Sequence, residues 1–252
     1  MMSIFIAIYV TLLGLMLGSF YNVVALRIPE GESIIHPPSR CSSCGTRLHA
    51  RDLIPVFSFL LSGGKCRYCS VKLSAIYPLG EAATGLLFLW VYLRTGLTGE
   101  SLVGLTLVSL GVIVTAADLK YMRIPNKVLL FFTPILMILR LIYHDNSLWS
   151  HILGAFAGGG IILLIILISR GGMGMGDAKL LALCGLVIGL PGTLLALFIA
   201  CVLGTVVGGA LMLAGRIKRK QHIPFGPWLI IGILVSYGYG SQIISGYLSL
   251  IG

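Results

Sequence analysis

Long apolar runs, several of them near 20 residues, constrain this chain more than any other feature. A helix of about 20 apolar residues crosses the roughly 30 Å hydrocarbon core of a bilayer. The composition agrees, since 57% of the 252 residues are hydrophobic and only 10% are charged. The runs do not alternate apolar and polar residues, as the strands of a membrane barrel would. We therefore predict an all-α polytopic membrane protein.

The hydropathy pattern predicts eight transmembrane segments. The first is predicted to be a retained span, because no basic residue precedes it as in a signal peptide. With both termini on the outer side, Arg94 and Arg140 are the only outer residues among the 18 Lys and Arg, in line with the positive-inside rule. A single crossing over 178–214 would place the basic run 216–220 outside, so we expect two crossings with a turn at Pro191-Gly192. The segments are roughly 4–26, 76–93, 101–118, 125–143, 151–169, 178–190, 193–214 and 225–250.

These segments divide the chain into three predicted parts, a first transmembrane helix (1–26), a cytoplasmic loop domain (27–75) and a helical bundle (76–252). The net charge of +10 arises from basic residues beside the apolar runs. Such a distribution is typical of membrane orientation, so no nucleic-acid partner is expected. Anionic membrane lipids are the expected partners of the basic loops.

The loop contains the most specific chemical motif, two C-x2-C pairs. Cys41, Cys44, Cys66 and Cys69 have the spacing of a tetrahedral zinc site. The predicted reducing compartment favours a metal over disulfides, and reduced thiols without a metal are the alternative. Four thiolates leave no open coordination position. The zinc is therefore predicted to be structural and to stabilise a loop too small for a large core.

Two aspartates within apolar sequence are the candidate catalytic residues. Asp118 lies where one predicted span ends, and Asp177 lies in a glycine-rich segment where a later span begins. Two complete spans between them bring both to the inner membrane face. A close carboxylate pair shares one proton, so one member can activate water while the other protonates a carbonyl oxygen. A helix-capping role for Asp177 and carboxylate-coupled transport are the alternatives.

Further motifs occur in a fixed order along the chain. They are Gly18-Ser-Phe-Tyr-Asn22-Val-Val, the two cysteine pairs, YPLGE ending in Glu81, Asp118 followed by Ile124-Pro125, Gly174-Met-Gly176-Asp177-Ala-Lys179, and IPFGPWL at 223–229. As an ordered set they resemble the type IV prepilin peptidases (leader peptidase/N-methyltransferases), which are GxGD-type membrane aspartic peptidases. The resemblance covers nearly the whole chain.

The resemblance implies a bifunctional enzyme of the bacterial inner membrane that serves type IV pili or type II secretion. It would cleave prepilin or pseudopilin leaders after a glycine at the cytoplasmic face. It would then N-methylate the new terminal residue with S-adenosyl-L-methionine. The catalytic pair that it implies is Asp118 and Asp177.

Supporting roles are predicted for five further residues. Gly174 and Gly176 would let the backbone approach a substrate strand and present Asp177 on a tight turn. Lys179 would tune the aspartates, although a lysine that reaches the headgroups is an equal explanation. Asn22 and Glu81 are candidates for the methyltransferase site, with hydrogen bonding inside the bundle as the favoured alternative. The competing functions are a transporter with a zinc-stabilised loop and a scaffold that binds partners through that loop.

Overall fold

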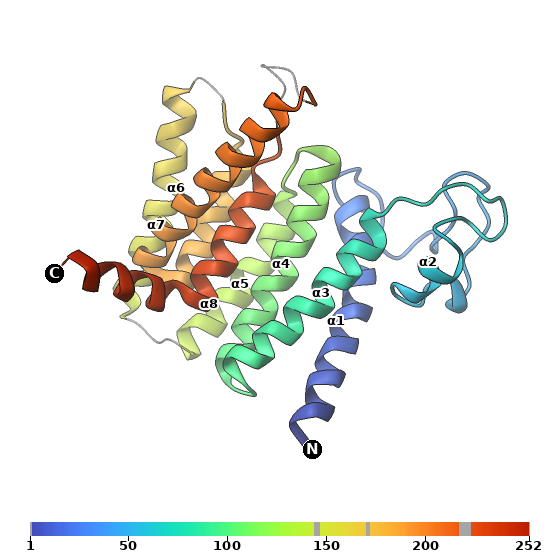
Figure 1. The fold of residues 1–252 in the computed structure, drawn as a ribbon, viewed down its shortest axis with the longest axis horizontal. Helices are drawn as coiled ribbons and strands as arrows, with labels where there is room; N and C mark the ends of the chain where they lie inside the picture. The colour runs from blue at the N-terminus through green and yellow to red at the C-terminus, as the bar shows by residue number, and fades with distance from the viewer. Residues whose placement is uncertain (1, 144–146, 170–171, 217–222, 252) are drawn as a thin grey trace. The chain divides into compact units, whose positions relative to one another are not determined.

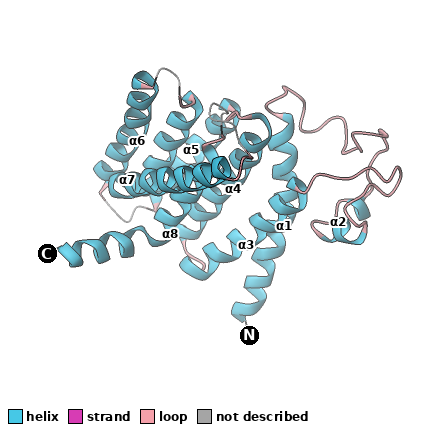
Figure 2. Ribbon diagram, turned by 45° about the horizontal axis from the view of Figure 1, so that its top comes forward, coloured by secondary structure: helices cyan, strands magenta, loops and turns pink. Residues whose placement is uncertain are grey.

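The computed structural model describes residues 2–143, 147–169, 172–216 and 223–251, and within these ranges it contains helices and loops but no strand (Figures 1 and 2). The all-α prediction is therefore confirmed. Four basic residues used in the topology prediction, Arg170, Lys218, Arg219 and Lys220, lie outside these ranges. The chain forms two compact units, Met1–Ser101 (unit 1) and Leu102–Gly252 (unit 2).

Unit 1 is an antiparallel pair of long helices with a loop between them. The helices are α1 (Met2–Arg27) and α3 (Ile76–Thr95), and the loop contains the 3-10 helix η1 (Ala50–Asp52) and the short α2 (Phe57–Leu61). Glycines allow the close approach of α1 and α3. A Cβ on Gly14 would lie 2.8 Å from Gly85 Cα, and one on Gly18 would lie 2.8 Å from Glu81 Cα.

Unit 2 is a helical bundle. Its helices are α4 (Gly99–Tyr121, which begins at the boundary between the units), α5 (Asn126–Ile142), α6 (Leu148–Ile168), α7 (Met175–Leu213) and α8 (Gly226–Ile251). The core lies along α4, where Val108, Leu110 and Val114 are inaccessible to solvent. The glycine-rich face of α6 packs against α7, since a Cβ on Gly158 would lie 2.7 Å from Leu181 O.

Helix α7 reverses its direction at Gly189, where φ is 72° and ψ is 175°. Its first half begins at Met175 and carries Asp177, which shares a cavity with Asp118 at the end of α4. Its second half passes Gly204, which lies against Phe225 at the start of α8. Both halves therefore extend toward the same end of the bundle (Figure 1). Glycine tolerates this positive φ, whereas other residues rarely adopt it.

The reversal corrects one detail of the sequence prediction. The turn between the segments 178–190 and 193–214 lies at Gly189, and not at Pro191-Gly192. Pro191 begins the second half of α7, where its missing N–H would have no helical partner in any case.

Within the described residues, six helices are long and apolar enough to cross a membrane, namely α1, α3, α4, α6, α7 and α8. Eight transmembrane helices are not confirmed for two reasons. The two segments predicted within 178–214 belong to α7, which counts once among the six. The segment predicted at 125–143 forms α5, which has 17 residues and is not among them.

Candidate active site and metal centre

A cavity of about 290 Å³ in unit 2 is lined by both predicted catalytic aspartates. Asp118 and Asp177 are only 6% and 8% exposed, so both carboxylates lie in a poorly hydrated environment. Their chain segments are distant in sequence, and the bundle brings them together. The cavity lining comes from the end of α4 and the turn after it, from the first residue of α5 and from the start of α7: Asp118, Met122, Arg123, Ile124, Asn126, Gly174, Met175, Gly176, Asp177 and Lys179.

Asp118 is held by the backbone of α8. Its Oδ2 accepts a hydrogen bond of 2.9 Å from the N–H of Gly226, the first residue of that helix. N–H groups in a first helical turn have no partner within the helix and carry partial positive charge. A Cβ on Gly226 would lie 2.7 Å from the same carboxylate oxygen. Glycine therefore allows the N–H to reach Asp118, a role that the sequence reasoning missed although the residue lies in the IPFGPWL motif.

Asp177 is the third residue of α7, and its Oδ2 accepts the N–H of Gly174, the N-cap, at 3.2 Å. This is half of a capping box, so Asp177 helps to cap α7 from its third position, whereas the N-cap residue is Gly174 and not Asp177. Asp177 also lines the cavity, so the cap and a chemical role are compatible.

The two glycines before Asp177 serve different needs. A Cβ on Gly176 would lie 2.9 Å from Ile124 Cβ, so this glycine allows the start of α7 to approach the segment after α4. Gly174 has φ −83° and ψ 143°, a conformation that other residues adopt. The prediction that glycine allows a close approach of the backbone therefore applies to Gly176, where the neighbour is another segment of the protein. The conformation of Gly174 does not require glycine.

Lys179 lines the cavity and donates a hydrogen bond of 2.9 Å from Nζ to Asn126 Oδ1. This bond joins the first turn of α7 to the first residue of α5. Among the described residues, no ion pair links Lys179 to either aspartate. An electrostatic effect of Lys179 on the pair stays a prediction, and Asn126 is a second residue that sequence reasoning missed.

The four predicted zinc ligands converge in unit 1. Their Sγ atoms all lie within 4.8 Å of one another, and those of Cys41 and Cys69 are 3.8 Å apart. A tetrahedral zinc ion with Zn–S distances of about 2.3 Å would separate its sulfurs by roughly 3.8 Å. None of these cysteines forms a disulfide. The cluster therefore fits a zinc ion.

Both cysteine pairs begin the same backbone turn. The N–H of Gly45 donates to Cys41 O and the N–H of Ser70 donates to Cys66 O, both at 2.9 Å. Gly45 and Ser70 also share a left-handed conformation, with φ of 69° and 58°. The two pairs are thus matched knuckles whose thiols face one another.

The surroundings of Cys44 favour the thiolate that zinc binds. The Sγ of Cys44 and the hydroxyl oxygen of Thr46 form a hydrogen bond of 3.2 Å. Bonds with the side chain and then the backbone of Thr46 lower the pKa of Cys44 to about 6. A thiolate is the metal-binding form of cysteine, so the lowered pKa of Cys44 favours metal binding. A backbone hydrogen bond with Val71 lowers the pKa of Cys69, whereas burial and the neighbouring cysteines outweigh it and raise the pKa of Cys69 to about 11.

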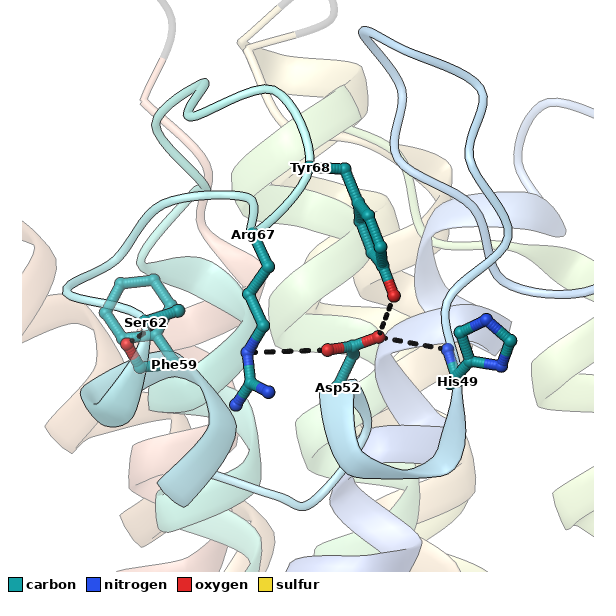
Figure 3. Close-up of polar contacts among 6 residues, drawn as sticks. All are labelled: His49, Asp52, Phe59, Ser62, Arg67 and Tyr68. Carbon is teal, nitrogen blue, oxygen red and sulfur yellow. Dashed lines mark hydrogen bonds and ion pairs between the residues drawn. The ribbon is translucent and has the colours of Figure 1, made fainter.

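Asp52 connects the segments that carry the two knuckles (Figure 3). Its Oδ2 accepts the N–H of His49 at 3.1 Å and the hydroxyl of Tyr68 at 3.0 Å, and its Oδ1 lies 3.5 Å from Arg67 Nε. Desolvation raises the pKa of Asp52, but these neighbours and Arg51 outweigh it, and the pKa lies below its usual value. Asp52 therefore holds the second cysteine pair against the segment that follows the first.

Asn22 and Glu81 are buried in unit 1 and engaged with backbone groups. Asn22 Nδ2 donates to Tyr77 O at 2.9 Å, and Glu81 Oε2 accepts the N–H of Val56 at 2.7 Å. Hydrogen bonding inside the protein, the favoured alternative for both residues, is therefore observed. Asn22 Oδ1 is buried without a hydrogen-bond partner among the described residues. A role of Asn22 or Glu81 in the methyltransferase site stays a prediction.

Comparison with known proteins gives matches along most of the chain. Residues 12–95 match the bacterial peptidase A24 N-terminal domain, and residues 105–209 match the type IV leader peptidase family. The gap between these matches contains the boundary between units 1 and 2. No solved structure matches the chain.

Curated relatives carry one name, prepilin leader peptidase/N-methyltransferase. The protein of Bacillus subtilis with this name is 40% identical over 237 residues, which cover 94% of this chain and 96% of that protein. A Pseudomonas putida protein is 31% identical, with 96% and 93% covered, and a Neisseria gonorrhoeae protein is 31% identical, with 87% and 85% covered. The transporter and scaffold hypotheses gain no support from these names. The chain belongs to the type IV leader peptidase family.

Proposed function

We propose that this protein is a membrane aspartic endopeptidase that removes the leader peptide of prepilins or pseudopilins after a glycine and then N-methylates the new terminal residue. The observation that carries the proposal is the pair of buried aspartates, Asp118 and Asp177, on one cavity of a leader peptidase family member. The names of the relatives supply the substrate class and the second activity.

The proposed cleavage uses the two aspartates as base and acid. The ionised carboxylate takes a proton from water, and the water oxygen attacks the scissile carbonyl carbon. The protonated carboxyl group donates its proton to the carbonyl oxygen. Collapse of the tetrahedral intermediate breaks the C–N bond, and the proton taken from water passes from the first carboxyl group to the leaving amine. The second carboxylate takes the proton of one gem-diol hydroxyl as the product carboxyl group forms, which restores the shared proton.

We assign the base role to Asp118 and the acid role to Asp177. The carboxylate of Asp118 faces the N-terminus of α8 and accepts the Gly226 N–H at 2.9 Å, a contact that stabilises negative charge. The bond from Gly174 to Asp177 is longer, at 3.2 Å. Gly226 is in this scheme a positioning residue, because it fixes Asp118 without contacting substrate.

We further infer eight membrane crossings in the bacterial inner membrane, with both termini on the outer side. The reversal of α7 at Gly189 supports two crossings by that helix, and α5 would supply one more beside the other candidate spans. The cavity would then open at the cytoplasmic face, where Arg123 and Lys179 line it. A prepilin could keep its apolar helix in the bilayer and present its leader junction at this boundary.

Each of the three predicted parts of the chain then has its own role. Residues 1–26 anchor the loop domain, residues 27–75 hold a structural zinc through their four cysteines, and residues 76–252 carry the aspartates. S-adenosyl-L-methionine would supply the methyl group. This assignment depends on the shared name of the relatives and on no particular side chain.

The test is cleavage of a prepilin-like peptide by purified protein in detergent. Asp118→Asn and Asp177→Asn should each lower the rate by at least ~10²–10⁴-fold, the usual contribution of a general acid or base. Glu30→Gln, which changes an exposed loop carboxylate, is the matched control and should cleave normally. Thermal unfolding checks that each variant is folded. Full cleavage by either aspartate variant would exclude the proposed pair, and mass spectrometry of the product terminus reports methylation separately.

A further inference from the structure

The segment 53–61 of the loop, which we call the apolar tip, exposes large apolar side chains. It includes α2, and no charged residue occurs between positions 53 and 64. Such a concentration of exposed apolar surface marks an interaction site more often than a solvated loop. The exposed residues are Leu53 (40%), Ile54 (49%), Phe57 (58%), Leu60 (65%) and Leu61 (79%).

The apolar tip has a fixed conformation. Val56, just before α2, has φ 63°, which is rare for a β-branched residue, and its N–H donates to Glu81 Oε2 at 2.7 Å. After α2, Ser62 Oγ donates to Phe59 O at 3.1 Å (Figure 3). The ring of Phe59 lies against Gly64, where an added Cβ would meet Cζ at 3.1 Å. Phe59 is thus turned inward, while its neighbours Phe57, Leu60 and Leu61 face outward.

The bond to Glu81 places the apolar tip beside a candidate membrane span. Glu81 lies five residues after Ile76, where α3 begins. At a rise of about 1.5 Å per residue, it is roughly 8 Å along the helix. Because α3 is long and apolar enough to cross a membrane, the backbone of Val56 lies alongside its first turns and not far above them.

Cations flank the apolar tip on both sides in sequence. Arg51 and Asp52 precede it, and Lys65 and Arg67 follow it. Arg67 is paired with Asp52, so Arg51 and Lys65 are the exposed flanking cations outside that ion pair. Apolar residues between cations are typical of segments that insert into the interface of an anionic membrane, where the cations meet lipid phosphates.

We propose that the apolar tip inserts into the headgroup–acyl boundary of an anionic bilayer, next to α3. The loop domain would then touch the membrane through Phe57, Leu60 and Leu61, in addition to its tethers through α1 and α3. The proposal is independent of the catalytic assignment, because it concerns unit 1 alone.

Photo-cross-linking in proteoliposomes of phosphatidylethanolamine and phosphatidylglycerol tests this contact. The full chain would carry p-benzoylphenylalanine at Phe57 or at Leu61 in separate variants. Ile35 is the matched control, because it lies in the same loop, is apolar and is 73% exposed. We expect lipid adducts at positions 57 and 61 with a yield about fivefold or more above that at position 35, since an inserted side chain is surrounded by acyl chains.

Other results would overturn the proposal. Equal lipid yields at the three positions would mean that the apolar tip has no preferred membrane contact. Adducts from both test positions to residues 102–252 or to a second copy of the chain would identify protein as the partner. The substitution at Phe57 replaces one aromatic side chain with another and should disturb folding least. If the Leu61 variant does not fold, the Phe57 variant alone can still test the proposal.

Discussion

Units 1 and 2 each bury a carboxylate that accepts a backbone N–H from a distant part of the chain. In unit 1, Glu81 of α3 holds Val56 of the loop at 2.7 Å. In unit 2, Asp118 of α4 accepts from Gly226 of α8 at 2.9 Å. The first bond fixes a loop to a helix, and the second fixes the carboxylate of a proposed catalytic residue between helices. The same kind of hydrogen bond therefore stabilises the loop of unit 1 and orients the side chain of Asp118 in unit 2.

The packing around these carboxylates explains the difference. Between residues 27 and 75, Cys41 and Cys66 are the only buried residues, so the loop has no apolar core. Within α4, in contrast, 72% of the most apolar window is buried. The loop therefore depends on a few hydrogen bonds and its cysteine cluster for its order, whereas close packing orders the bundle and fixes the position of its carboxylate.

Removal of the proposed zinc should have the largest effect of all, because it should unfold the loop of unit 1 and leave the bundle of unit 2 intact. Structural zinc contributes about 10–16 kcal/mol in small metal-dependent domains, and the loop has no core to replace it. Cys66→Ser, or treatment with a strong chelator, should expose residues 30–75 to limited proteolysis while the bundle resists. Metal analysis of the untreated protein should find about one zinc per chain. Equal protease resistance with and without metal would show that the loop folds without zinc. Cys201→Ser, at an exposed cysteine outside the cluster, is the control.

Gly226→Ala should disturb the aspartate pair without unfolding the bundle. The added Cβ would lie 2.7 Å from Asp118 Oδ2, so the carboxylate must move. A displacement of this size at a catalytic group should lower the cleavage rate by roughly 10–100-fold. Gly246→Ala in the same helix is the matched control, since nothing lies within 4 Å of its added Cβ. Peptide cleavage assays that give equal rates for both variants would remove the positioning role.

Glu81→Gln should weaken the link between the loop and α3. The amide oxygen can still accept the Val56 N–H, but a hydrogen bond to a charged group is worth about 1.5–3 kcal/mol against roughly 1 for a neutral pair. Protease nicking within 53–61 should rise several-fold while zinc content stays constant. Glu32→Gln, at an exposed loop position, should leave nicking unchanged. An unchanged nicking rate for Glu81→Gln would argue that the metal alone orders the loop.

The smallest effect is expected at the position that follows each cysteine pair, where one knuckle has glycine and the other has serine. Ser70 adopts φ 58° where its counterpart Gly45 has φ 69°. A non-glycine residue in this region costs about 1 kcal/mol, so Ser70→Gly should stabilise the loop slightly and Gly45→Ser should destabilise it by a similar amount. Chelator competition should show zinc retention rising in the first variant and falling in the second. Changes in the same direction would contradict the matched-turn description.

Side chains that carry chemistry were visible in the sequence, whereas their backbone partners were not. The four cysteines and the two aspartates were predicted from type and spacing, and the structure brings each set together. Gly226 was missed because its contribution is an N–H, which every residue except proline possesses. Asn126 was missed because a polar residue at a helix start has an ordinary explanation as part of a cap.

The position of the break in α7 was likewise only partly predictable from the sequence. The sequence predicted a reversal inside 178–214 from its length, its charge pattern and Pro191-Gly192. The break itself lies at Gly189, because proline is accepted at the start of a helix and glycine alone adopts the required positive φ readily. The local signal thus indicated the turn, and packing against α6 and α8 selected the residue.

The sequence by itself determined the helical membrane class, the cysteine set and the identity of the two acids, because these depend on residue type and period. The tertiary structure alone decided that Gly226 holds Asp118, that Asn126 holds Lys179 and that Val56 is fixed to Glu81. Each of these contacts joins separate elements of the fold. Such contacts depend on how helices and loops pack, and packing is a property of the whole chain that no local pattern records.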